Sequence, residues 1–284
     1  MAEVFNFMID PDEDISLHEA VLKSDFEKMV FLLNEKPSRL NETMGAVGVT
    51  PLRCAAAVGS AVCVQELLRR GAEVDVVDIK AQTPLFVAVY NSHTEVCRLL
   101  LEAGADPDGS RENLSSPLQI ACQNGFSAGL KLLLEYGAAL EGYPVHPLHI
   151  AASHDHLACF FLLLLYGSRT DLETYSFRHR SLAHSIVGRR LPPIYIYLWL
   201  LFGGKVDDSS RSLMQEVEDY RALVEFIGRP LSLKNQCRIA IRKRMKCCNM
   251  QHVSALGIPE VLADFLLYKD IPNVAGIHDH ICWL

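Results

Sequence analysis

The chain has 284 residues, half of them hydrophobic, and a formal net charge of −7 at pH 7. This size suffices for one large or two modest domains with a sizeable core. The acidic balance argues against nucleic acid as the main partner. The longest apolar runs, at 159–166 and 194–202, are shorter than the ~18–20 residues of a membrane-spanning helix. We therefore predict core helices there and no membrane partner.

The nine cysteines are scattered through apolar segments without Cys-x-x-Cys pairs. This usage favours reduced thiols, several of them acting as small core residues. The first sixteen residues are acidic and carry no basic side chain, which is the wrong polarity for a secretory signal. We expect a cytoplasmic location, with the nucleus as the alternative.

Residues 1–13 precede the first regular pattern and include an apolar patch, Phe-Asn-Phe-Met-Ile, at residues 5–9. Two interpretations stay open for this N-terminal segment. It folds back to cap the first repeat, or it forms an arm that contacts a target protein.

A short motif then recurs along two thirds of the chain. The motif is a tripeptide that ends in Pro-Leu and begins at Thr50, Thr83, Ser116 and His146. Its leucines lie 33, 33 and 30 residues apart. An earlier copy is anchored at Leu17. Each copy places an alanine three residues after the anchor leucine and a leucine pair fifteen and sixteen residues after it; four copies add a glycine at nineteen.

Each landmark has a physical role. The Thr or Ser hydroxyl caps a helix whose first position suits proline, because the missing N–H of proline costs nothing there. The alanine lets two helices approach closely, and the leucine pair forms the buried stripe of a second helix. Glycine takes the left-handed conformation that ends this helix. The pattern predicts a helix–loop–helix–turn unit that must stack on its neighbours to bury its apolar face.

The repeating unit resembles the ankyrin repeat. We predict an all-α solenoid of about six repeats over residues 14–204, with the first and last repeats degenerate. In the first copy Lys36-Pro37 stands where the glycine would be. The sixth copy begins at Leu182 and ends at Gly203-Gly204.

The period stops after residue 204. Residues 205–228 are charged and predict a helical connector that packs on the last repeat. Beyond them Leu233, Cys237 and Ile241 are spaced i, i+4 and i+8, which places them on one narrow face of a helix. From spacing alone, an amphipathic helix that closes the solenoid is the preferred interpretation. The resemblance of this region to a known family, described next, changes this interpretation.

Residues 231–241 (Leu-Ser-Leu-Lys-Asn-Gln-Cys-Arg-Ile-Ala-Ile) are similar to the BC box, the elongin-binding element of a SOCS box. Residues 253–266 resemble the cullin box that ends it, although Gly257 replaces a proline usual in the family. The chain is identified as a member of the ankyrin repeat and SOCS box family, with a SOCS box over residues 229–271 and a tail over 272–284.

The resemblance implies a substrate-recognition subunit of an elongin BC–cullin-5-type RING ubiquitin ligase. Elongin C would bind Leu233, Cys237 and Ile241, with elongin B alongside. The cullin, with its RING-box protein, would bind Leu256, Ile258, Pro259 and Leu262. An unknown protein substrate would bind the ankyrin array, through residues that the sequence does not identify. No catalytic residue, cofactor or metal is expected.

Other interpretations are weaker. The alternative function is an ankyrin scaffold or inhibitor whose last helices only cap the solenoid; an enzyme is a distant third. The histidines at His146, His149, His154 and His156 fit ankyrin positions better than a metal site, and the cysteines and histidines after residue 246 lack a four-ligand spacing. The basic residues from Arg238 to Lys246 are expected to form the solvated face of the BC-box helix.

Overall fold

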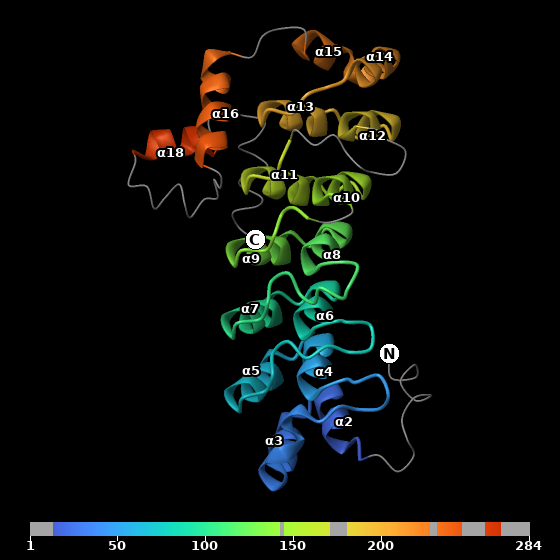
Figure 1. Cartoon of the computed structure of the whole chain (residues 1–284), viewed down its shortest axis with the longest axis vertical. Coiled ribbons are helices and arrows are strands. Elements are labelled where there is room, and N and C mark those ends of the chain that lie inside the picture. Colours follow the sequence, from blue (N-terminus) through green and yellow to red (C-terminus); the bar gives the residue numbers. More distant parts are fainter. Residues whose placement is uncertain (1–13, 143–144, 171–180, 228–231, 246–258, 268–284) are drawn as a thin grey trace. The chain divides into compact units, whose positions relative to one another are not determined.

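In a computed structural model of the chain (Figure 1), residues 14–142, 145–170, 181–227, 232–245 and 259–267 are described. They divide between two compact units, residues 1–139 and 140–284. Apart from an isolated bridge between Met44 and Val49, regular structure within these ranges is helical. The predicted all-α class is confirmed. No helix in the described ranges has the length and apolar character to cross a membrane.

The first unit consists of helix pairs, each with one inner and one outer helix. The inner helices are α2 (Ser16–Leu22), α4 (Pro51–Val58), α6 (Pro84–Tyr90) and α8 (Pro117–Asn124). The outer helices are α3 (Phe26–Glu35), α5 (Ala61–Arg69), α7 (Thr94–Glu102) and α9 (Ser127–Glu135). A short 3₁₀ helix, η1 (Pro37–Asn41), follows α3. Inner helices pack on inner helices and outer on outer, as expected for stacked repeats.

The repeated motif starts α4, α6 and α8 as predicted. The hydroxyls of Thr50, Thr83 and Ser116 accept hydrogen bonds of 3.2–3.3 Å from the backbone N–H three residues later. Proline occupies the first turn in all three helices. The capping oxygen satisfies one of the N–H groups that have no partner within the helix. Thus the motif fixes where these three inner helices begin.

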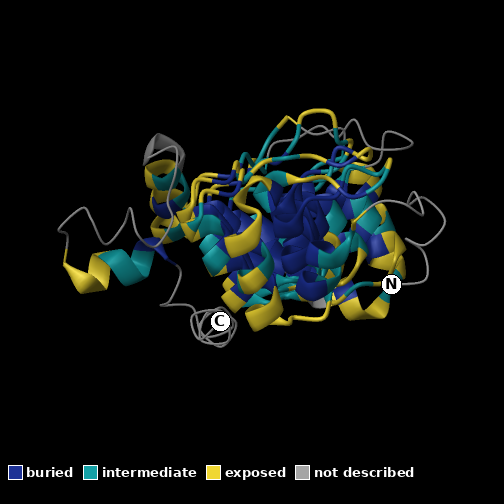
Figure 2. Ribbon diagram, turned by 90° about the horizontal axis from the view of Figure 1, so that it is seen from below, coloured by how far each residue is buried: buried dark blue, intermediate teal, exposed yellow. Residues whose placement is uncertain are grey.

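The close approach of the helices depends on small residues. The landmark alanines Ala55, Ala88 and Ala121 are fully buried. After the outer helices, Gly71 and Gly104 have φ of +90° and +91°, a conformation that glycine adopts without strain. Figure 2 shows that the buried residues are concentrated on the helices, whereas most of the connecting loops are exposed or partly exposed.

The second unit begins with two more helix pairs. These are α10 (Pro147–Ser153) with α11 (Leu157–Leu165), and α12 (Leu182–Gly188) with α13 (Ile194–Leu201). Aromatic edges fill the space between α11 and α13: the ring centres of Phe160 and Tyr195 are 5.0 Å apart and those of Phe161 and Phe202 are 6.1 Å apart. Such edge-to-face contacts add to the apolar burial.

The segment that follows packs on the last helix pair. It comprises α14 (Asp208–Glu216), η2 (Glu218–Tyr220) and α15 (Arg221–Ile227). The Ser181 hydroxyl, which caps α12, donates to Asp207 at 2.9 Å. The buried Tyr220 donates its hydroxyl hydrogen to the Leu191 carbonyl. These bonds hold the connector to the start of α12 and to the loop that follows it.

The last described helices are α16 (Leu233–Met245) and α18 (Glu260–Leu266), which pack on each other. Residues 1–13 and 272–284, predicted as an arm or cap and as a tail, lie outside the described residues.

Candidate protein-docking sites

Helix α16 presents an apolar row to the solvent. Leu233 is 76% exposed, Ile241 is 38% exposed, and Cys237 between them is also exposed. Their spacing aligns them along one face of the helix. Large apolar side chains are usually buried, so a contiguous exposed row on a formed helix indicates a surface for another protein.

The opposite face of α16 is anchored by arginines. Arg238 is fully buried, and its guanidinium carbon lies 4.3 Å from the centre of the Phe265 ring on α18. Arg242 donates to the carbonyl of Leu266 at 2.8 Å, where α18 ends. Both contacts join α16 to the helix that forms the second half of the predicted cullin box.

Arg242 also binds the end of an ankyrin helix. It donates to the carbonyls of Leu164 and Leu165 at 3.2 and 2.7 Å, in the last turn of α11. Its guanidinium carbon lies 5.0 Å from the centre of the Phe202 ring, which follows α13. The last carbonyls of a helix have no partner within it and carry a partial negative charge, which suits a guanidinium.

The expectation that the basic residues form a solvated face is therefore wrong for Arg238 and Arg242. Each guanidinium lies over an aromatic ring, and Arg242 also donates hydrogen bonds to backbone carbonyls. The spacing of residues along α16 could not predict these contacts. The side chains of Lys243, Arg244 and Lys246 lie outside the described residues.

Part of the predicted cullin-binding segment is described. Pro259 is exposed at the start of α18, and Leu262 is 42% exposed. At the end of α18, Leu266 and Leu267 are buried together against Phe265. Leu256, Gly257 and Ile258 lie outside the described residues. The first turn of α18, which includes Leu262, is thus exposed, and its last turn is packed.

The cysteines and histidines of the described repeats serve packing and local hydrogen bonding. Cys54, Cys97 and Cys159 are buried, and burial raises the pKa of each thiol to about 12. Their prediction as small core residues is confirmed. His146 pairs with Glu141 at 3.3 Å. Among the described residues, no group of three or more His, Cys, Asp or Glu is placed to hold a metal ion.

A hollow of about 910 Å³ runs over the inner helices of the first unit. Its apolar walls include Leu22 of α2, Val58 of α4, and Phe86 and Tyr90 of α6. We call this surface the inner groove. The repeat pattern did not identify these residues, because Tyr90 and Leu22 are not landmarks of the repeat.

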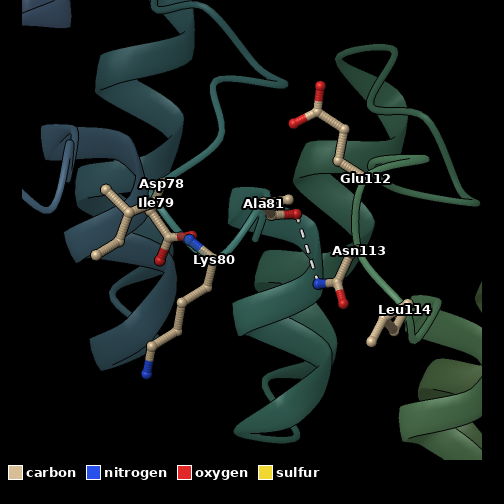
Figure 3. Close-up of a pocket in the computed structure, with 7 residues that line it drawn as sticks. All are labelled: Asp78, Ile79, Lys80, Ala81, Glu112, Asn113 and Leu114. Atoms are coloured by element: carbon tan, nitrogen blue, oxygen red, sulfur yellow. Dashed lines mark hydrogen bonds between the residues drawn. The ribbon is translucent and has the colours of Figure 1, made fainter.

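The loop before α6 forms one rim of the inner groove. The buried carboxylate of Asp78 accepts from the backbone N–H of Lys80 at 2.8 Å and of Gln82 at 2.9 Å. Arg53 on α4 pairs with Asp78 at 2.5 Å. The next loop is tied to this one by Asn113, which donates to the Ala81 carbonyl at 3.5 Å (Figure 3). A second hollow of about 510 Å³ lies between the two loops.

Two family models match the chain. Ankyrin repeats match over residues 17–111 and 108–174. The SOCS box matches over residues 229–267, which contain α16 and α18. Human "Ankyrin repeat and SOCS box protein 1" is 37% identical, covering 90% of this chain and 89% of the relative. The chain belongs to the ankyrin repeat and SOCS box family.

Other members support the assignment. Human "Ankyrin repeat and SOCS box protein 12" is 39% identical, covering 92% of this chain and 93% of the relative. The crystal structure of the human ASB11 ankyrin repeat domain has a TM-score of 0.59 at 23% identity, covering 80% of this chain and 96% of that one. The Bcl-3 ankyrin domain has a TM-score of 0.60 at 25% identity, covering 68% of this chain and 88% of that one. These structures show the ankyrin fold.

Proposed function

We propose that this protein is the substrate-recognition subunit of an elongin BC–cullin-5-type RING ubiquitin ligase. Membership of the ankyrin repeat and SOCS box family implies the role of a substrate receptor in the ubiquitin pathway. The observation that carries the finer proposal is the exposed apolar row of Leu233, Cys237 and Ile241 on a helix whose other face is anchored.

The exposed row has the chemistry of a helix that docks into an apolar groove. Full burial of a leucine side chain contributes about 1.5–3 kcal/mol, and Leu233 has most of its surface still to bury. The small side chain of Cys237 allows a close approach. Because the helix is already formed and held by Arg238 and Arg242, less ordering entropy is lost on binding. These features suit capture by elongin C, accompanied by elongin B.

The cullin and its RING-box protein are proposed to bind next to elongin. Contacts between α16 and α18 hold the exposed Leu262 beside the elongin-binding helix. Pro259, Leu256 and Ile258 complete the proposed contact, and they stay predictions. We propose a cytoplasmic location for this assembly, with the nucleus as the alternative.

The proposed mechanism is proximity. The ankyrin array holds the target, and the SOCS box holds the machinery that carries activated ubiquitin. Linking two binding events through one chain raises the effective concentration of the target lysines near the ubiquitin thioester. In this role the chain contributes binding and orientation, and the chemistry belongs to its partners.

Co-expression with elongins B and C tests this function. We expect a stoichiometric complex that survives size-exclusion chromatography and then recruits the purified cullin with its RING-box protein. A soluble, monodisperse chain that elutes without the elongins would instead indicate a scaffold or inhibitor. A reconstituted ubiquitination reaction, with and without the chain, then tests target transfer.

A further inference from the structure

The inner groove is apolar and open. Phe86 and Val87 form part of its floor, and Tyr90 stands 59% exposed at its side. Val58 and Leu22 contribute from the two preceding repeats. Three inner helices thus share one surface onto which large apolar side chains can pack.

The charge of the groove is opposite to that of the chain. The whole chain carries 34 acidic against 27 basic residues. Among the residues that the structure describes, the lining of the groove includes Arg53 and Lys80 and no Asp or Glu. Arg53 is paired with Asp78 at the rim, so the remaining charge of the lining is that of Lys80. A positive charge beside an apolar surface favours a partner segment that carries a carboxylate.

The two basic side chains differ in what they offer a partner. Arg53 is buried, and its bonds to Asp78 and to Gln82 at 3.1 Å use the same nitrogen, Nη2. Its buried Nε has no acceptor within the described ranges. The exposed Lys80 forms no ion pair with another described residue. Figure 3 shows Lys80 and Glu112 extending in opposite directions, so Glu112 does not neutralise it.

Hydrogen bonds within the chain hold the walls of the groove in place before any ligand binds. Asp78 holds the backbone on either side of Lys80 through the bonds to Lys80 and Gln82. The His93 ring hydrogen-bonds the Ala57 carbonyl at 3.2 Å. Gly59 leaves room for that ring, since a Cβ there would lie 2.5 Å from His93 Nδ1. A rim and a wall held in this way lose little freedom when a ligand binds.

We propose that the inner groove docks a segment of the target protein in which a carboxylate lies beside large apolar side chains. The carboxylate pairs with Lys80 at the rim. The apolar side chains pack on Phe86, Val58 and Tyr90. This inference rests on the proposed function, because it names the class of target segment that the ankyrin array presents for ubiquitination.

Selection from a random-sequence peptide display library tests the proposal, with the full chain as bait, with and without elongins B and C. We expect enriched peptides to carry Asp or Glu next to Leu, Ile, Phe or Trp. Synthetic copies of the winners, measured by fluorescence anisotropy, should bind Lys80→Glu roughly five- to tenfold more weakly, because an attraction becomes a repulsion at the rim. Replacing the peptide's Asp or Glu by Lys should restore binding to Lys80→Glu.

Matched variants locate the effect. Lys28→Glu makes the same charge change at an exposed position of α3, and Tyr136→Ala removes an exposed tyrosine after α9. We expect neither to alter peptide binding, whereas Tyr90→Ala weakens it. Peptides without an acidic preference, or equal losses in Lys28→Glu and Lys80→Glu, would overturn the proposal.

Two further outcomes are separable. Elongin capture is measured on the same preparations, so loss of peptide selectivity with intact elongin capture overturns the groove proposal alone. Residues 5–14 of the chain themselves combine apolar and acidic side chains. If selectivity appears only after deletion of residues 1–13, the chain's own segment is the occupant and the target proposal is overturned.

Discussion

Arg238 lies over the ring of Phe265, with 4.3 Å between the guanidinium carbon and the ring centre. The two residues belong to α16 and α18, which the family resemblance assigns to elongin and cullin binding. Arg238 is fully buried on the side of α16 away from Leu233. The contact therefore couples the position of α18 to α16 without touching the apolar row.

Replacing Arg238 by Gln is expected to weaken cullin binding and to leave elongin binding intact. A desolvated cation–π contact contributes about 0.5–2 kcal/mol, which corresponds to a roughly two- to thirtyfold loss of affinity. The measurement is calorimetric titration of the cullin into the preformed elongin complex. Lys234→Gln is the matched control, because Lys234 lies 5.5 Å from the same ring and is exposed. Equal cullin affinities for wild type and Arg238→Gln would contradict this role.

Arg242 is expected to hold α16 against the ankyrin helices of the second unit. Arg242→Gln removes the donors to Leu164, Leu165 and Leu266. A hydrogen bond to a charged group contributes about 1.5–3 kcal/mol, so amide exchange in α16 should accelerate roughly ten- to 150-fold. The check is hydrogen–deuterium exchange on the full chain, read by mass spectrometry.

Arg242→Lys separates charge from geometry, because an ammonium cannot span carbonyls of two helices as a guanidinium fork does. We expect an intermediate acceleration in α16 and none in α4 or α6. Unchanged exchange in α16 of Arg242→Gln would mean that the anchoring lies elsewhere.

Leu233→Asp should abolish elongin capture. The change places a carboxylate where an apolar pocket is proposed, which costs several kcal/mol if the group stays charged. The readout is the yield of the elongin complex after co-expression, with the helical melt of the array as a check on folding. Val62→Asp is the control, since it puts the same charge at another exposed apolar position, on α5. Elongin capture by Leu233→Asp at the wild-type level would remove the BC-box assignment.

The sequence predicted the features that are local or periodic. A cap such as Thr83 acts within one turn of helix, and the row from Leu233 to Ile241 follows from the pitch of α16. Both can be inferred without knowing what packs nearby. The landmark alanines could be predicted for the same reason, since every repeat presents the same neighbour.

The features that the sequence did not predict depend on distant partners. Arg242 meets carbonyls 77 and 78 residues earlier in the chain, and Arg238 meets a ring on another helix. No spacing rule within α16 distinguishes these arginines from solvated ones. The inner groove takes Leu22, Val58 and Tyr90 from three repeats at positions outside the repeated pattern, so only the stacked helices bring them together.

The stability of the second unit is expected to fall in mild acid because of His149. This side chain is buried in α10, and its Nε2 has no partner within the described residues. Burial, and then the charge of a protonated His146, lowers the pKa of His149 to about 4 from an ordinary value of 6.5. The folded state thus favours the neutral ring, while the unfolded chain takes up a proton below pH 6.5. The contribution is complete above pH 6.5 and is lost as the pH falls towards 4, up to about 3 kcal/mol.

Urea unfolding at pH 7 and at pH 4.5, followed by the fluorescence of the buried Trp199 in the same unit, measures this loss. His149→Gln replaces the ring by a neutral side chain, so the free energy of unfolding should differ less between the two pH values by about 2–3 kcal/mol. His154→Gln, an exposed histidine that follows α10, is the control and should keep the wild-type difference. If His149→Gln also keeps the full wild-type difference, the acid sensitivity belongs to other groups and the buried ring does not control it.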